Sequence, residues 1–220
     1  MQLQSRAKSM ASWVLSAFKT RNRATMLTLY KSMVRSHLEY CCPLWNSSKV
    51  ADIQLLESVQ WTFTSRISGV QHLNYWERLE SLKLMSLQRR RERYIIIHMW
   101  KVLYDRCPND LNIVFAAPSR HGTKALVPRL KKSSSMHNQS LYDGSFAVMG
   151  PRLWNTIPSH LYSVADPLQF KIKLTEFLKT ISDEPRVSGY SSTNGNSLLE
   201  WSMSKATTTL QGQSGSPMTQ

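Results

Sequence analysis

Apolar residues in the first half of the chain recur at intervals of three and four, which is the repeat of an amphipathic α-helix. The clearest stripe consists of Met26, Leu27, Tyr30, Met33, Val34, His37, Leu38 and Cys41. Pro43 then ends the run, because proline interrupts helical hydrogen bonding. Similar stripes cover residues 10–18, 50–67 and 86–104. The pattern therefore predicts a small bundle of helices over residues 1–106, joined by short loops.

Residues with known preferences for helix ends support this division. Asn74 is placed to cap a short helix, and Pro108 lies just beyond the last helix of the bundle. In the first helix the face that we expect to be buried consists of Met10, Trp13, Val14, Ala17 and Phe18. The fold class predicted for this half is therefore mainly α.

The composition of the sequence and the spacing of its apolar residues change at about Pro108. Residues 107–182 are interrupted by Pro, Ser and Gly, and their apolar residues come in short runs. Runs around 113–116 and 124–130 are compatible with a short β-hairpin, whereas 146–155 and 167–180 have helical spacing. This predicts an irregular α+β segment. Residues 183–220 are rich in Ser, Thr, Gly and Asn and poor in core residues, so we expect a disordered tail.

The chain is strongly basic, with 28 Lys and Arg against 14 Asp and Glu and a net charge of +14. Residues 180–220 are slightly acidic, which leaves the positive charge on the part that is expected to fold. Such a surface attracts polyanions, because each neutralised phosphate releases counterions. Nucleic acid is therefore the expected partner, and ordinary surface charge is the alternative.

Basic residues gather at three places, each a candidate for contacts with a nucleic-acid backbone. The densest is the run from Arg89 to Arg93, where guanidinium groups on one helix face match phosphates. The alternative is a solvated face partly paired with Glu92. The candidate nucleic-acid-binding residues are Lys19, Arg21 and Arg23, then Arg89, Arg90 and Arg93, and finally Arg129, Lys131 and Lys132.

Motifs for catalysis or for a bound metal are missing from the sequence. There is no Gly-x-Ser-x-Gly motif and no Gly-rich loop of the kind that binds phosphates. His37 and Cys41 are spaced for one face of a helix, but a structural zinc needs four ligands and no second pair follows. No catalytic residue, metal or cofactor is therefore predicted, and His37 and Cys41 are expected on a buried helix face.

The sequence also bears on location. No apolar stretch is long enough to cross a membrane, and the run at 13–18 is too short for a secretory signal. The odd set of three cysteines suits a reducing compartment. We therefore expect an intracellular protein, nuclear or cytoplasmic, that is not secreted and has no membrane partner. Residues 1–38 hold seven basic and no acidic residues, so a mitochondrial presequence is a further hypothesis.

Four blocks of sequence, in order, resemble the reverse transcriptases of non-LTR (LINE-type, jockey-like) retrotransposons. The blocks are residues 26–46 (MLTLYKSMVRSHLEYCCPLWN), 53–69 (IQLLESVQWTFTSRISG), 73–91 (LNYWERLESLKLMSLQRRR) and 152–158 (RLWNTIP), the last with Phe146 before it and Phe170-Lys171 after it. In that family these blocks follow the catalytic palm and form the thumb and the region after it. The resemblance covers residues 7–182.

The resemblance implies that this chain is a fragment of an RNA-directed DNA polymerase without its catalytic palm. The family's centre is a Tyr-x-Asp-Asp turn with an upstream Asp, which together hold two metal ions. This sequence has no Asp-Asp pair, since Tyr104-Asp105 is followed by Arg106 and Tyr142-Asp143 by Gly144. We therefore expect no polymerase activity from this chain alone.

What the resemblance leaves is a thumb-like module that binds RNA or an RNA–DNA hybrid without sequence preference. The arginine run would contact the template–primer backbone. The alternative is a non-functional or repurposed helical remnant that interacts with proteins and has no nucleic-acid role. The sequence specifies no oligomeric state.

Overall fold

The computed structural model describes residues 2–43, 50–110, 112–116, 123–128, 142–184 and 197–203, with side chains from residue 4 onward. These residues are mainly helical and contain no β-strand, as the sequence predicts for the fold class. In chain order the elements are α1 (Gln2–Ala17), α2 (Arg23–Leu29), the π-helical turn η1 (Tyr30–Val34), α3 (Arg35–Glu39), α4 (Val50–Thr64), α5 (Tyr75–Ser81), α6 (Leu87–Leu103), α8 (Phe146–Trp154), the 3₁₀ turn η2 (Ser159–Leu161) and α9 (Pro167–Lys179). None of these helices combines the length and apolar composition that crossing a bilayer requires.

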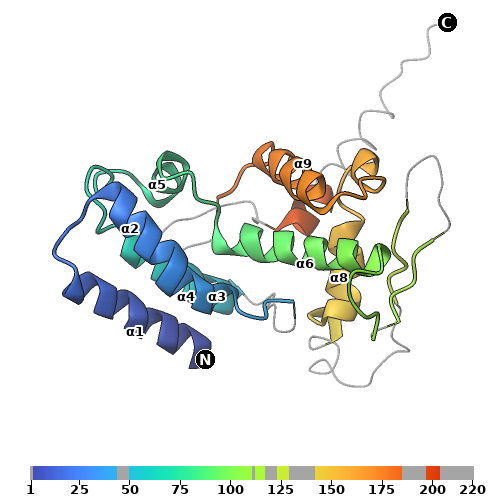
Figure 1. Ribbon diagram of the computed structural model, residues 1–220, viewed down its shortest axis with the longest axis horizontal. Helices are drawn as coiled ribbons and strands as arrows, with labels where there is room; N and C mark the ends of the chain where they lie inside the picture. The colour runs from blue at the N-terminus through green and yellow to red at the C-terminus, as the bar shows by residue number, and fades with distance from the viewer. Residues whose placement is uncertain are drawn as a thin grey trace, which may run out of the picture.

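Helix α6 passes through two separate hydrophobic clusters. Figure 1 shows α1 to α5 on one side of the molecule, α8 and α9 on the other, and α6 between them. At its start, Leu87 packs into the N-terminal cluster, which is built from α1 to α5. From Ile95 onward the same helix packs into the C-terminal cluster with α8, η2 and α9. The C-terminal cluster therefore begins inside α6, upstream of the boundary that we placed after residue 106.

The second predicted helix contains a π-helical turn that changes which side chains are buried. The buried residues are Met26, Tyr30, Val34, Leu38 and Cys42, which recur at every fourth position. In a regular α-helix this spacing drifts by about 40° per step, and the wider turn at Tyr30–Val34 compensates for the drift. The prediction that His37 and Cys41 face the core is therefore wrong, since His37 is half-buried and Cys41 is exposed.

Helix α1 packs on the bundle through small side chains. Its buried residues are Ala7, Ala11 and Val14, whereas Trp13 is 53% exposed. Alanines at the contact let the helix lie close to α3 and α4, and a face carrying an indole could not approach so closely. The buried face of α1 is therefore rotated about the helix axis relative to the predicted one. Of the residues predicted to face the core, only Val14 is fully buried.

The helix starts that the sequence predicts are confirmed. The Asn74 side chain accepts a hydrogen bond from the Glu77 backbone N–H, and the Glu77 carboxylate accepts one from the Asn74 backbone N–H. Helix α9 begins with Pro167, and its N-cap Asp166 accepts from the Gln169 N–H at 2.6 Å. These side chains satisfy backbone donors that a helix start leaves without partners.

The segments expected to form a β-hairpin make a single antiparallel bridge, between Phe115 and Ala125. Asn155, at the end of α8, holds this bridge by accepting from the Ala125 N–H and donating to its carbonyl, both at 2.9 Å. Trp154 donates to the carbonyl of Thr123 at 2.8 Å. The bridge is thus fixed to α8 by side chains, and in the described part of the chain it does not extend into a strand.

Part of the expected disordered tail is folded. Residues 198–203 are helical, and Leu198 is fully buried in the C-terminal cluster. Trp201 packs edge-on against Phe177 of α9, with ring centroids 5.8 Å apart. The apolar residues in this segment explain the docking, because they bury area against α6 and α9. Residues 185–196 and 204–220 lie outside the described residues.

Candidate nucleic-acid interface

In the arginine run of α6, two side chains are buried and the other two are half-buried. Arg89 is only 1% exposed, and its guanidinium donates to the carbonyl of Ser182 at 3.1 Å. Arg91 is buried as well. Glu92, the expected surface partner, is also buried and accepts from the backbone N–H of Leu198. The prediction that Arg89 offers its guanidinium to an external phosphate is therefore wrong for this fold.

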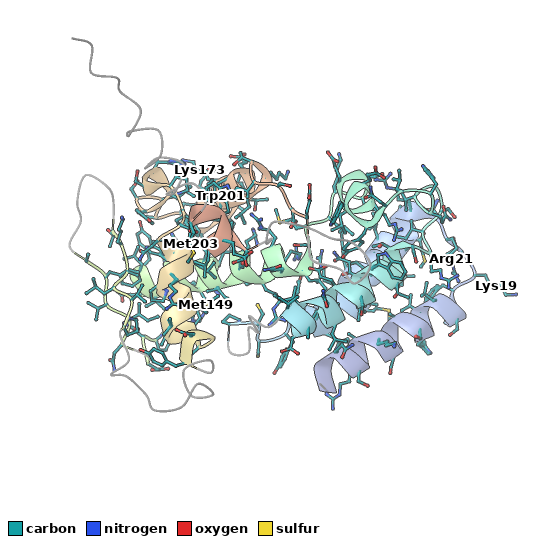
Figure 2. The ribbon with its side chains drawn as sticks, turned by 180° about the vertical axis from the view of Figure 1, so that it is seen from behind. Lys19, Arg21, Met149, Lys173, Trp201 and Met203 are labelled. Atoms are coloured by element: carbon teal, nitrogen blue, oxygen red, sulfur yellow. The ribbon has the colours of Figure 1, made fainter. Side chains whose placement is uncertain are left out.

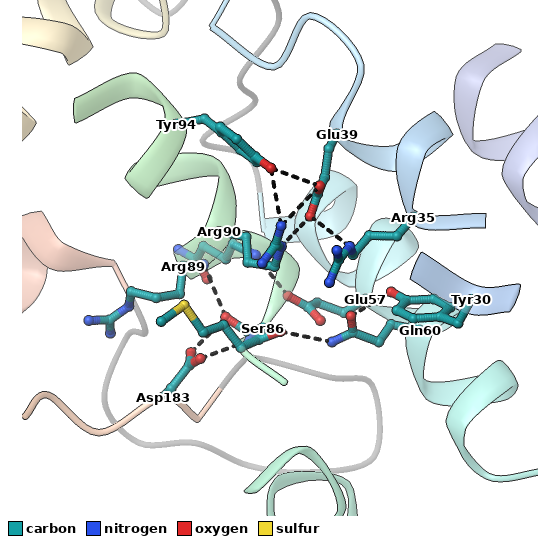
Figure 3. Close-up of polar contacts among 12 residues, drawn as sticks. Tyr30, Arg35, Glu39, Glu57, Gln60, Ser86, Arg89, Arg90, Tyr94 and Asp183 are labelled. Atoms are coloured by element: carbon teal, nitrogen blue, oxygen red, sulfur yellow. Dashed lines mark hydrogen bonds and ion pairs between the residues drawn. The ribbon is translucent and has the colours of Figure 1, made fainter. Parts of the chain in front are cut away.

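Arg90 joins α6 to the end of α3. Its guanidinium forms two hydrogen bonds with the Glu39 carboxylate, one through Nε and one through Nη2 at 3.1 Å. Tyr94 donates to the same carboxylate at 3.2 Å, and Arg35 lies 3.5 Å from it. Figure 3 shows these side chains converging on Glu39. A guanidinium that is used in this way holds two helices together, so Arg90 has little capacity left for phosphate.

Arg93 joins α6 to α9. Its Nε donates to the Thr175 hydroxyl at 3.0 Å, and Nη2 donates to the carbonyl of Lys171 at 3.4 Å. Burial lowers the pKa of this guanidinium, and the charge of Arg90 nearby lowers it further. With Arg89 and Arg90, it braces α6 against three other segments of the chain. The run is thus a structural brace in this fold.

A buried polar network lies beneath the brace. The Glu57 carboxylate of α4 accepts from the Tyr75 hydroxyl at 2.7 Å and from the Gln88 backbone N–H at 3.0 Å. Gln60 accepts from the Tyr30 hydroxyl (Figure 3), and its amide donates to the Tyr75 hydroxyl. Burial raises the pKa of Glu57 to about 7 despite these hydrogen bonds. The network links α4, α5 and α6 at the centre of the protein.

The second predicted group, at the corner between α1 and α2, divides into one structural and two exposed residues. Arg21 donates to the carbonyls of Leu15 at 2.7 Å, Thr20 at 2.9 Å and Phe18. It therefore caps the end of α1, where free carbonyls favour a cation. Lys19 and Arg23 are exposed. Figure 2 shows Lys19 projecting from this end of the molecule.

The loop after α4 adds another cation at the same corner. The Ser68 backbone N–H donates to the carbonyl of Arg21 at 2.9 Å, which fixes this loop beside the α1–α2 connection. Arg66, in that loop, is exposed. We call Lys19, Arg23 and Arg66 the basic corner. None of the three forms an ion pair with a described residue, so their charges face solvent.

The third predicted group lies in a segment that the structure does not describe. Arg129, Lys131 and Lys132 lie outside the residues that the structure describes. Lys124, just before them, is exposed. This group therefore stays a prediction.

The described tryptophans differ in burial, and the two exposed ones were not among the candidate site residues predicted from the sequence. Trp100 and Trp154 are buried in the C-terminal cluster. Trp13 and Trp61 are 53% and 38% exposed. Helical spacing suggested a core position for Trp13, and only the run of small residues at Ala7 and Ala11 signals the other face. Trp13 therefore joins the set of candidate contacts with nucleic acid.

Within the described residues no three His, Cys, Asp or Glu side chains are grouped as a metal site requires. The two adjacent cysteines after α3 differ in exposure, since Cys41 is exposed and Cys42 is buried. Burial raises the pKa of the Cys42 thiol to about 11. That thiol stays protonated at neutral pH and is a poor ligand, since metals bind the thiolate.

No family model, curated protein or solved structure matches the chain.

Proposed function

We propose that this chain is the thumb-like part of a non-LTR retrotransposon reverse transcriptase and binds RNA or an RNA–DNA hybrid through its backbone. The observation that carries the proposal is the basic corner, where Lys19, Arg23 and Arg66 face solvent without an ion pair among described residues. The four ordered sequence blocks support the assignment to this family. A remnant of this kind would act in the nucleus or the cytoplasm.

The corner suits backbone contacts rather than base recognition. Lysine and arginine on exposed loops neutralise phosphates and release counterions, and this effect does not depend on base sequence. Residues 1–38 contain no acidic side chain, so the sequence there offers nothing that repels a phosphate. The proposal excludes the arginine run of α6, since those side chains are used inside the protein.

Charge-removal variants test the corner. Lys19→Gln, Arg23→Gln and Arg66→Gln combined should weaken binding to a fluorescent homopolymer RNA and flatten its salt dependence by about 2 in log–log slope, since each single-strand phosphate contact contributes about 0.7. The matched control removes three charges from α9, as Lys171→Gln, Lys173→Gln and Lys179→Gln. Figure 2 places Lys173 far from Lys19.

The outcome decides the location of the interface. The corner variant should bind clearly more weakly than the α9 control, with both melting at the same temperature as the wild type. Equal losses would mean that net charge acts without a defined site, and no loss in either would contradict the proposal. A primer-extension assay with Mg²⁺ should show no incorporation, because this chain has no adjacent aspartates.

A second candidate function rests on the outer face of α9. Leu168 and Ile172 are one turn apart and are 64% and 43% exposed. An amphipathic helix can dock on another protein through apolar residues that lie one turn apart on its exposed face. This favours the alternative of a helical interaction module, which predicts that neither charge-removal variant changes an affinity for RNA.

A further inference from the structure

Helix α1 borders a shallow groove that the basic corner does not include. The groove has a volume of about 400 Å³, and its lining residues are Ser5, Arg6, Ser9, Met10, Trp13 and His37. All but His37 come from one face of α1, and His37 comes from α3. The exposed surface of the groove is mainly apolar, and the groove carries one cation, Arg6, one large aromatic ring, Trp13, and no carboxylate.

The Trp13 indole is held in place although it is exposed. Phe18 packs against it nearly at a right angle, at 83° and with ring centroids 6.4 Å apart. Half of the side chain still faces solvent. Leaving the largest apolar side chain in water forgoes the stabilisation that burial would give. An exposed aromatic ring that is supported in this way has the properties needed for stacking with a base.

Cations lie on both sides of this ring along α1. Arg6 is exposed, and it precedes Trp13 by seven residues, or about 10 Å of helix. Lys19 of the basic corner lies at the other end of the helix, six residues after Trp13. Figure 2 shows Lys19 at the end of α1. Arg6, Trp13 and Lys19 follow one another along the direction of α1, so a strand that runs along this helix can contact all three.

We propose that the α1 groove binds single-stranded nucleic acid, with an unpaired base stacked on Trp13 and neighbouring phosphates bound by Arg6 and Lys19. This inference rests on the proposed function and makes it more specific. Backbone contacts alone do not distinguish single strands from duplexes, whereas stacking requires an unpaired base. The chain should therefore prefer single strands.

A lipid surface fits the groove less well. Membrane-binding helices insert a broad apolar face, and the apolar face of α1 is already buried in the bundle through Ala7, Ala11 and Val14. Trp13 is the one large aromatic side chain that lines the groove. The charge of the groove and its single ring match a phosphate backbone with one base.

The test compares Trp13→Ala with a single-stranded RNA and a duplex of the same length, by fluorescence anisotropy. Trp13→Ala should weaken single-strand binding by about fivefold or more and leave duplex binding unchanged, because stacking contributes about 1–3 kcal/mol per base. Trp13→Phe should restore part of the affinity. Trp61→Ala, which removes another exposed indole, is the matched control and should change neither affinity.

Abasic strands provide a second arm. Trp13→Ala should bind an abasic single strand as well as the wild type does, because that strand has no base to stack. An equal loss on single strands, duplexes and abasic strands, or no loss on any, would overturn the inference. Loss of binding to anionic lipid vesicles with RNA affinity intact would overturn it in favour of a membrane surface.

The two proposals fail differently. A wild type that binds none of these nucleic acids at low salt overturns the proposed function, and the inference falls with it. A wild type that binds RNA while Trp13→Ala behaves identically leaves the proposed function in place and overturns the inference alone. Trp13 is exposed, so the variant is expected to fold, and its far-UV circular dichroism should match that of the wild type.

Discussion

Arg90 and Glu39, which are 51 positions apart in sequence, form a two-point hydrogen-bonded pair that fastens α6 to the end of α3. Their side chains are 17% and 11% exposed, so the pair is largely withdrawn from water. Paired groups in such a place stabilise a contact mainly because removing one of them leaves the other charge buried. The consequence is that a cluster that looks like a nucleic-acid site in sequence serves the fold.

Glu39→Gln is the first prediction. The substitution removes the charge that faces Arg90, Arg35 and the Tyr94 hydroxyl, and should lower the free energy of unfolding by about 2 kcal/mol. Urea denaturation measures this. Glu80→Gln, at an exposed site on α5, is the control and should be nearly neutral. RNA affinity should not change in either variant. A weaker affinity in well-folded Glu39→Gln would return Arg90 to the binding site.

Stability should depend on pH because two carboxyls are buried. Burial raises the pKa of Glu57 and that of Glu92 to about 7, from a usual value of 4.5. Between these values the folded chain binds more protons than the unfolded chain. Their contribution to stability is therefore complete below pH 4.5 and is lost as the pH rises through 7.

Urea denaturation across this range tests the sign. The free energy of unfolding should be higher below pH 4.5 than above pH 7, by about 3 kcal/mol for each group across the whole window. Glu57→Gln keeps an acceptor for the Gln88 N–H and should remove about half of the difference. A stability that rises with pH over the same range would show that these carboxyls are stabilised as anions.

Gly150 of α8 lies directly against the Met99 side chain of α6. A Cβ at this position would lie 2.7 Å from the Met99 sulfur and 3.3 Å from the Phe146 ring. Gly150→Ala should therefore destabilise the protein by about 1 kcal/mol, although alanine favours helix, because the core must shift. In Met99→Ala the same substitution should become neutral or stabilising. Additive effects in this double-mutant cycle would contradict the contact.

The docked segment around Leu198 gives another prediction. Leu198→Ala should lower stability by about 2–3 kcal/mol, because it removes a fully buried side chain from the C-terminal cluster. Met203→Ala, at a position 67% exposed, is the control and should have almost no effect. Thermal or urea unfolding measures both. A neutral Leu198→Ala would mean that this segment does not pack on the protein in solution.

Much of the helical framework could be predicted from local patterns, because a helix start depends on residues close in sequence. Asn74 and Pro167 both set helix ends where expected. The register failed where a nonlocal or irregular feature decides it. The π turn at Tyr30–Val34 rotates the downstream face, and the packing of Ala7 against neighbouring helices turns Trp13 outward.

The candidate site was less predictable, because the sequence does not indicate which distant residue a charged side chain will contact. Arg90 pairs with Glu39 and Arg89 bonds to Ser182, and neither partner is near in sequence. Arg21 is different, because a cation just after a predicted helix end could have been recognised as a cap. What the sequence analysis did capture is the pair of exposed cations, Lys19 and Arg23.

The central claim is that the exposed cations of this chain bind a nucleic-acid backbone. The most direct measurement is the affinity for a homopolymer RNA as a function of salt. We predict a log–log slope of about −2 or steeper, corresponding to about three neutralised phosphates on a single strand. A slope near zero, or no binding at low salt, would contradict the claim and favour the helical interaction module.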